Sequence, residues 1–414
     1  MSIGLAAATL GGLVGYALFK RIRMPGLLGM LFAGIMLGPY GLNLIHHELI
    51  AVSADLREMA LIIILLRAGL EMSFKTIAQV GRTALLMSVL PASFELLGVV
   101  ILAPKLLGVS TLEAAILGAV LSAVSPAVVV PSMIDLQQRK IGTDKGIPAT
   151  LIAAASVDDV LVIVVFTSLL GMYLGNRPNA AACLVRIPIS ILSGCALGAA
   201  IGLGLVWFFR RVHIRDTVKA LIIVSLAIVM VWLESLLAAS VPMSGLLAVM
   251  AVGVMLLERD EALAERLRVK FEKSWIGAQI LLFVLVGAQV DISVAWRAGL
   301  AGLAVIFGAL AFRCVGVWVA LIGSELTFRE RLFCMLAYIP KATVQAAIGA
   351  VPLAVGVESG ELILAVAVLS ILTTAPLGAT AIKLTATRLL TTDGYSELLG
   401  ECTLKSSING GHQE

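Results

Sequence analysis

The chain has 414 residues, of which 60% are hydrophobic and only 14% are charged, against roughly 25% charged residues in an ordinary soluble domain. The mean hydropathy is +1.05, and at about 20 apolar residues per spanning helix the chain is long enough for about a dozen spans or more. This composition excludes a soluble enzyme, a nucleic-acid-binding protein and a disordered scaffold, while Lys and Arg in cytoplasmic loops account for the net charge of +4.

Apolar runs separated by charged or turn residues predict about thirteen membrane-spanning helices. In chain order they cover residues 3–19, 27–45, 55–72, 83–107, 112–135, 147–173, 184–209, 217–238, 241–257, 274–290, 296–323, 328–356 and 359–385. None shows the alternation, about ten residues long, of β-barrel strands. No A-x-A cleavage site follows the first run, so we interpret it as a span and not a signal peptide. The sequence therefore predicts an all-α membrane protein.

The loops predict the orientation of the chain. Most of the 30 Lys and Arg residues fall in loops on one side of the membrane, which the positive-inside rule assigns to the cytoplasm. We therefore expect the N-terminus outside and the C-terminus in the cytoplasm, in a plasma membrane or a bacterial inner membrane. The five cysteines lie in apolar segments or in the tail and form no disulfide framework.

A charged segment, residues 258–273, divides the chain into halves of similar size and is predicted to be a cytoplasmic linker helix. The two halves share a short similarity, because Ala68–Ser73 (AGLEMS) resembles Ala288–Ser293 (AQVDIS). In the predicted topology the first stretch ends a span at the cytoplasmic side and the second ends one at the outer side. This arrangement is typical of an inverted-topology repeat.

Two adjacent acids, Asp158 and Asp159, lie midway along the sixth predicted span. A charge at the bilayer centre costs roughly 2.5–3.5 kcal/mol on insertion scales, so both residues need a function or a partner. Neighbouring positions on a helix point about 100° apart, which lets one carboxylate face a cavity and the other a neighbouring helix. Such a pair can hold a proton and release it to an arriving cation, and its oxygens suit hard cations. The sequence favours a Na⁺ and proton site here; the alternative is a structural pair satisfied by an arginine and backbone donors.

Prolines and polar residues in the middle of two spans predict broken helices. The breaks are expected near residues 122–131 and 338–345. The candidate residues are Ser122, Ser125, Pro126 and Pro131 in the first, and Pro340, Lys341, Thr343 and Gln345 in the second. Proline removes a backbone donor and leaves carbonyls free. Unwound backbone at membrane depth persists only where it is buried in protein or lines a cavity. A proline kink without function is the alternative for each segment alone.

Four more charged residues lie in or at the end of spans. Glu95 and Arg313 are near mid-depth on equivalent helices of the proposed repeat, so an interhelical ion pair is the simplest prediction, with a direct role in transport as the alternative. Arg67 and Glu71 are one turn apart and predict an intrahelical pair; they are secondary candidates for the site. All four histidines lie in loops or in the tail, which disfavours a histidine metal cage.

Four stretches carry a resemblance to a known family. They are LRAGL (66–70), AVSPAVVVPSM (123–133), SVDD (156–159) and PKATVQAAIG (340–349). On these stretches the chain resembles the cation:proton antiporter superfamily in its paired-aspartate branch. It is most similar there to the sodium/proton antiporter B subgroup (solute carrier family 9B) and its bacterial relatives. The resemblance covers nearly the whole chain in the order and spacing of its segments.

The resemblance implies a homodimer in which a core domain, holding two crossing broken helices, slides against a dimerisation domain in an elevator-like motion. It also implies that Asp159 is the main ion- and proton-binding carboxylate and Asp158 its neighbour. The expected boundaries are 1–50 for the first dimerisation spans, 51–175 for the first core half, 176–257 for a linker span and further dimerisation spans, 258–273 for the cytoplasmic linker, 274–390 for the second core half and 391–414 for a cytoplasmic tail. Arg313 with Glu95 resembles the electroneutral branch, although the paired aspartates mark the other, so the resemblance leaves the stoichiometry open.

The predicted function is exchange of Na⁺ (or Li⁺) for H⁺ across a lipid membrane, without a cofactor or a nucleic-acid partner. Three other functions are alternatives. A sodium-coupled organic-anion symporter would need more polar pocket residues, and a K⁺/H⁺ antiporter or channel would be expected to carry a cytoplasmic nucleotide-binding domain. An intramembrane aspartyl protease, the one enzyme considered, needs its two acids on separate facing helices.

Overall fold

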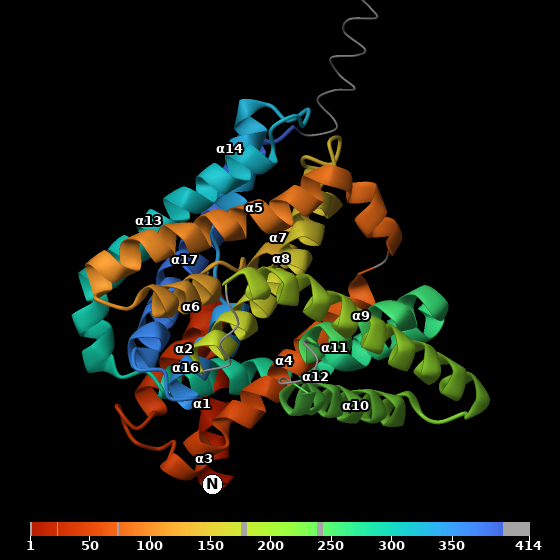
Figure 1. The fold of residues 1–414 in the computed structure, drawn as a ribbon, viewed down its shortest axis with the longest axis horizontal. Helices are drawn as coiled ribbons and strands as arrows, with labels where there is room; N and C mark the ends of the chain where they lie inside the picture. Colours follow the sequence, from red (N-terminus) through yellow and green to blue (C-terminus); the bar gives the residue numbers. More distant parts are fainter. Residues whose placement is uncertain (1, 23, 73, 175–179, 238–242, 392–414) are drawn as a thin grey trace, which may run out of the picture.

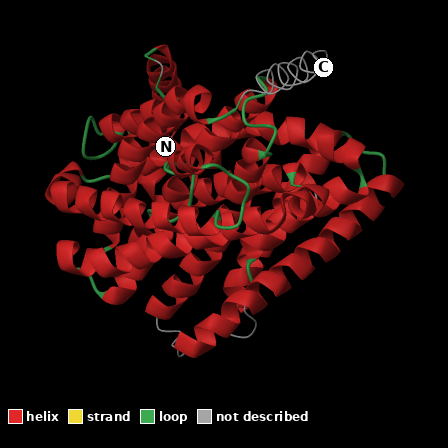
Figure 2. Ribbon diagram, turned by 90° about the horizontal axis from the view of Figure 1, so that it is seen from above, coloured by secondary structure: helices red, strands yellow, loops and turns green. Residues whose placement is uncertain are grey.

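The computed structural model describes residues 2–22, 24–72, 74–174, 180–237 and 243–391. Over these ranges the chain forms seventeen helices and no β-strand, as Figure 2 shows from above. Nine helical segments of the described residues are long and apolar enough to cross a membrane, and two shorter apolar segments, Gly26–Leu37 and Thr343–Ala354, accompany them. The predicted all-α class is thus confirmed for this part of the chain, while the count of about thirteen spans stays a prediction.

One group of helices packs together from both halves of the sequence. It contains α1 (Ser2–Arg21), α2 (Gly26–Leu37), α4 (Ser53–Glu71), α9 (Ala180–Arg211), α10 (Asp216–Leu237), α11 (Gly245–Arg259) and α12 (Glu261–Ala288). Within it, α11 lies along α9 and α4, and α12 lies along α2 and α4. We call it the scaffold group; α9, α10 and α11 lie on the right of Figure 1. The short α3 (His47–Ala51) precedes α4.

The remaining helices form a second group, which we call the core group. It contains α5 (Phe74–Leu107), α6 (Thr111–Leu121), α7 (Pro126–Gln138), α8 (Ile147–Tyr173), α13 (Ile292–Ala320), α14 (Phe328–Ala337), α15 (Thr343–Ile348), α16 (Val351–Ala354) and α17 (Gly360–Leu389). The long helices α5 and α13 pack along each other, and α8 packs against α5, α6 and α7. Helix α17 contacts α13 and α14.

Two sequence expectations take a different form in the structure. Helix α4 lies in the range expected for the first core half, yet it packs mainly along α11 and α12. At Gly69 its backbone comes close to the backbone of α11. Residues 261–273 of the expected linker are not a separate element. They begin α12, whose N-terminus is capped by the Asp260 side chain accepting from the Leu263 amide at 3.0 Å, and the helix continues without interruption to Ala288.

Close packing of α4 on α11 makes a stability prediction. A Cβ atom at Gly69 would overlap with the Met250 carbonyl oxygen and lie 3.1 Å from the Gly253 Cα. We expect Gly69→Ala to destabilise the protein by about 1–3 kcal/mol through overpacking, seen as a lower thermal unfolding midpoint in detergent. Gly204→Ala in α9, where a Cβ meets nothing within 4 Å, is the control. Equal midpoints for the two variants would contradict this packing.

Candidate functional site

The two broken segments meet in the middle of the core group. The first is unwound between the end of α6 at Leu121 and the start of α7 at Pro126, and the second between α14 and α15, over residues 338–342. The Ser125 amide donates to the Pro340 carbonyl at 2.8 Å, so the two breaks are hydrogen-bonded directly to each other. Pro131, which the sequence placed in the first break, lies inside α7. The unwound stretch therefore covers only residues 122–125 and is shorter than expected.

Side chains distant in sequence satisfy the carbonyl groups left free at the end of α6. Lys341 Nζ donates to the Leu121 carbonyl, Arg313 Nη1 donates to the Ser122 carbonyl, and Gln345 Nε2 donates to the Ala123 carbonyl at 2.9 Å. The last carbonyls of a helix lack partners within it and carry its partial negative charge. Two cationic side chains and an amide therefore stabilise a buried helix end whose carbonyl groups would otherwise lack partners.

Four charged residues form a buried charge cluster around this crossing. Arg313 Nη1 lies 2.6 Å from Glu95 Oε2, Arg313 Nη2 lies 3.1 Å from Asp158 Oδ2, and Lys341 Nζ lies 2.6 Å from Glu95 Oε1. Each of the four side chains is at most 1% exposed. With two acids and two bases, the buried charge cluster is neutral when all four groups are charged, which is the condition under which buried ions are tolerated.

Within the acid pair, the structure separates the two carboxylates. Asp158 Oδ2 accepts from the Val124 amide at 2.9 Å as well as from Arg313, so Asp158 has the arginine and the backbone donor of the structural alternative. Asp159 instead lines a cavity, and its Oδ1 atom has no hydrogen-bond partner among the described residues. The angle of about 100° between neighbouring helix positions accounts for the two environments.

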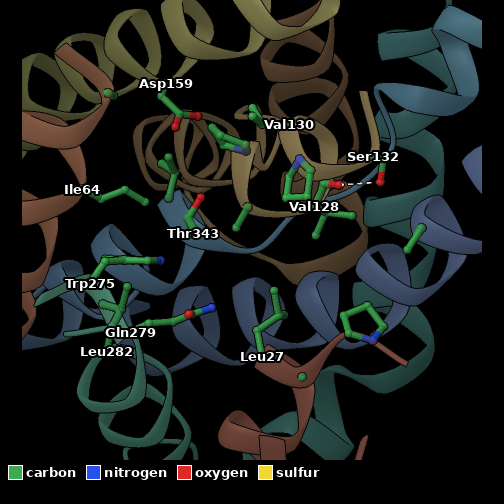
Figure 3. Close-up of a pocket in the computed structure, with 18 of the residues that line it drawn as sticks. Leu27, Ile64, Val128, Val130, Ser132, Asp159, Trp275, Gln279, Leu282 and Thr343 are labelled. Carbon is green, nitrogen blue, oxygen red and sulfur yellow. Dashed lines mark hydrogen bonds between the residues drawn. The ribbon is translucent and has the colours of Figure 1, made fainter. Parts of the chain in front are cut away.

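The cavity has a volume of 1190 Å³ and lies between the two groups of helices. The scaffold group contributes mainly apolar side chains, among them Ile64 of α4 and Trp275 and Leu282 of α12, while the core group contributes Asp159 and Thr343. Figure 3 shows Asp159 and Thr343 directed into this space from different helices. The Thr343 side chain is buried and its hydroxyl, like that of Ser125, has no hydrogen-bond partner in the described part of the chain.

Of the other residues predicted for the site, some line the cavity and one does not. Ser122 Oγ donates to the Ala119 carbonyl of its own helix at 3.1 Å, so its hydroxyl does not join the cavity. Arg67 and Glu71 line the cavity and form an intrahelical pair at 3.1 Å, with Arg268 of α12 3.8 Å from Glu71. Pro126 and Pro131 also line the cavity.

Two residues contact the cluster without having been predicted to do so, although Tyr338 begins the predicted second break. The Tyr338 carbonyl accepts from Arg313 Nε at 2.7 Å, and Thr374 Oγ1 accepts from the Lys341 amide at 3.1 Å. Tyr338 stands two residues before Pro340, so its place at the break was visible in the sequence. Thr374 lies in an ordinary apolar run of α17 and carries no such signal. In the residues that the structure describes, no group of three or more His, Cys, Asp or Glu side chains is arranged to hold a resident metal ion.

Comparison with known proteins identifies the family of this chain. The family described as sodium/hydrogen exchanger, transmembrane, matches residues 5–388. Sodium/hydrogen exchanger 9B2 of Xenopus tropicalis is 34% identical over 411 residues, which cover 94% of this chain and 74% of that protein. Human sodium/hydrogen exchanger 9B1 is 31% identical over 412 residues, which cover 94% of this chain and 78% of that protein.

The fold has a solved counterpart. The structure of the sodium proton antiporter MjNhaP1 from Methanocaldococcus jannaschii at pH 8 superposes with a TM-score of 0.79, covering 93% of this chain and 97% of that one at 18% sequence identity. At that identity the match supports the shared fold alone. The family match over most of the chain and the sequence identity to the 9B relatives establish the family as well as the fold. The chain is an integral, multi-pass membrane protein that belongs to the sodium/hydrogen exchanger family.

Proposed function

We propose that this protein exchanges Na⁺ or Li⁺ for H⁺, with the cation and the proton competing for Asp159. The observation that carries the proposal is the free carboxylate oxygen of Asp159 in the cavity, beside a charge cluster that is neutral without it. A site that accepts one cation or one proton, but not both, produces exchange without a separate gate for each ion. The name of the 9B relatives supports Na⁺ and H⁺ as the exchanged ions.

Unsatisfied oxygen atoms of the core group are suitable ligands for a dehydrated alkali cation. Asp158 Oδ1, Ser125 Oγ and Thr343 Oγ1 all lack hydrogen-bond partners among the described residues and lie on the elements that surround the break. Hard cations bind carboxylate and hydroxyl oxygens of this kind. We infer that these three atoms, together with Asp159, form the cation site.

The two packing groups support an elevator-like mechanism. The ion site belongs entirely to the core group, whereas α4 and α12 of the scaffold group form the opposite, mainly apolar wall of the cavity. Sliding of the core group along that wall would carry Asp159 across the membrane. We further propose that two copies associate through their scaffold groups as a homodimer in the lipid bilayer, with the N-terminus outside and the C-terminus in the cytoplasm, because the basic loops favour that orientation.

Charge balance predicts an electroneutral cycle. The buried charge cluster contributes no net charge, and Asp159 is neutralised equally by one Na⁺ or one H⁺. The loaded core group therefore carries the same charge in both directions, and one ion is exchanged for one proton. Since moving one charge across 100 mV is worth about 2.3 kcal/mol, a cycle that moved net charge would respond strongly to the membrane potential.

The test is proton movement in proteoliposomes, followed with a pH-sensitive dye after addition of Na⁺, Li⁺ or K⁺. We expect Na⁺ or Li⁺ to move protons at the same rate whether the membrane potential is clamped with valinomycin and K⁺ or left free. A rate that changes with the clamp would contradict one-for-one exchange. Proton movement with K⁺ alone would favour a K⁺/H⁺ antiporter, and none with any alkali cation would favour the organic-anion symporter.

A further inference from the structure

Tyr338, the residue that follows α14, contacts Arg313 in two ways. Its carbonyl accepts from Arg313 Nε at 2.7 Å, and the guanidinium carbon lies over its ring, 5.1 Å from the ring centre. The side chain is 0% exposed, and its hydroxyl has no hydrogen-bond partner over the described ranges. The contact with Arg313 is therefore made by the face of the ring and the backbone, and not by the hydroxyl group.

The orientation of the Arg313 guanidinium decides which acids it binds. A guanidinium is a planar fork with five N–H donors. Here Nη1 donates to Glu95 and to the Ser122 carbonyl, and Nη2 donates to Asp158. The flat ring of Tyr338 fixes the plane of this fork from one side. If the plane turned, the next carboxylate along α8 would be Asp159, which has a free oxygen.

We propose that Tyr338 is a positioning residue whose ring holds the Arg313 guanidinium on Asp158 and Glu95, so that Asp159 stays available to the transported cation. This inference rests on the proposed exchange function. Its consequence is kinetic: a guanidinium released from the ring competes with Na⁺ for Asp159, so the apparent KM for Na⁺ rises while the turnover of the loaded carrier changes little.

The test compares three variants in the proteoliposome assay. Tyr338→Leu removes the ring, Tyr338→Phe keeps the ring and removes only the hydroxyl, and Phe333→Leu removes a neighbouring ring. Phe333 is a matched control because it is 0% exposed and belongs to the same apolar cluster as Tyr338, whereas the cation–π contact of Arg313 within the described ranges is with Tyr338. We expect Tyr338→Leu to raise the KM for Na⁺ about tenfold, the scale of a desolvated cation–π contact. Tyr338→Phe should keep the KM of the wild type, and Phe333→Leu should lower only the unfolding temperature.

Three results would overturn the inference: an unchanged KM in Tyr338→Leu, an equal rise in Tyr338→Phe, or an equal rise in Phe333→Leu. If Tyr338→Leu does not fold, Tyr338→Met, whose longer and more flexible side chain adapts better to the space left by the ring, takes its place with the same expected rise. The wild-type protein is measured in the same vesicles. Absence of exchange by the wild type would contradict the proposed function, whereas normal exchange with no effect at Tyr338 would contradict only the positioning role.

Discussion

Asp159→Asn is expected to abolish cation-dependent proton movement while leaving the protein folded. Near neutral pH the asparagine amide can neither bind a proton nor neutralise a cation, so neither the proton-loaded nor the cation-loaded form of the carrier can arise. Folding should be preserved because Asp159 Oδ1 makes no hydrogen bond in the described structure and the neighbouring cavity has room for the amide. The measurement is dye dequenching in proteoliposomes, with the unfolding temperature recorded on the same preparation.

The matched control for this variant is Glu71→Gln. Glu71 is also an acid lining the cavity, but its carboxylate is 35% exposed and paired with Arg67, so its loss should reduce exchange only a fewfold. Robust exchange by Asp159→Asn would contradict the proposed site. Equal loss in both variants would show that any acid of the cavity, and not Asp159 in particular, is required.

Glu95→Gln is expected to destabilise the protein strongly. Glu95 is paired with both Arg313 and Lys341, so its neutralisation leaves Lys341 buried without an acid at close range. Removing one partner of a buried ion pair costs about 3–5 kcal/mol, far more than the cost of an exposed pair. The thermal unfolding temperature in detergent should therefore be many degrees lower than that of the wild type. Exchange should fall in proportion to the loss of folded protein.

A double variant tests whether the loss of stability comes from the unpaired lysine. Glu95→Gln combined with Lys341→Gln restores the charge balance of the cluster, because Arg313 and Asp158 remain as one base and one acid. We expect the double variant to be more stable than Glu95→Gln alone, a non-additivity typical of groups in one network. Asp135→Asn, which breaks an exposed pair with Arg139, should leave the unfolding temperature nearly unchanged. A double variant less stable than the single one would show that Lys341 does not depend on Glu95.

Hydropathy and proline placement were sufficient to predict much of this architecture. The apolar runs predicted where helices lie because each span must bury its own backbone polar groups, and the prolines at 126 and 340 marked the two breaks. Pro131 misled the prediction, since a proline within a membrane helix can be accommodated without unwinding it. The grouping of α4 with α11 and α12 could not be predicted, because it depends on which small residues face each other across a contact.

The site was predictable in its residue types but not in its connections. Paired aspartates in an apolar run are conspicuous because each carries a large insertion cost. Which of the two faces the cavity depends on the position of Arg313, which is 155 residues away from Asp158 in the sequence. The participation of Lys341 in the charge cluster and the ring of Tyr338 beside Arg313 are likewise contacts between distant segments, which no local pattern encodes.

The helix end at Leu121 also determines how this protein can be made. Its carbonyl groups are satisfied by Lys341, Gln345 and Arg313, which the ribosome adds about 190 to 225 residues later. Until those residues enter the bilayer, each unpaired carbonyl group there costs several kcal/mol. The first half of the chain must therefore remain hydrated at this point, or shielded by the insertion machinery, until the segments that carry Arg313, Lys341 and Gln345 have been synthesised. A chain truncated before α13 would lack all three donors and would leave these carbonyl groups unpaired.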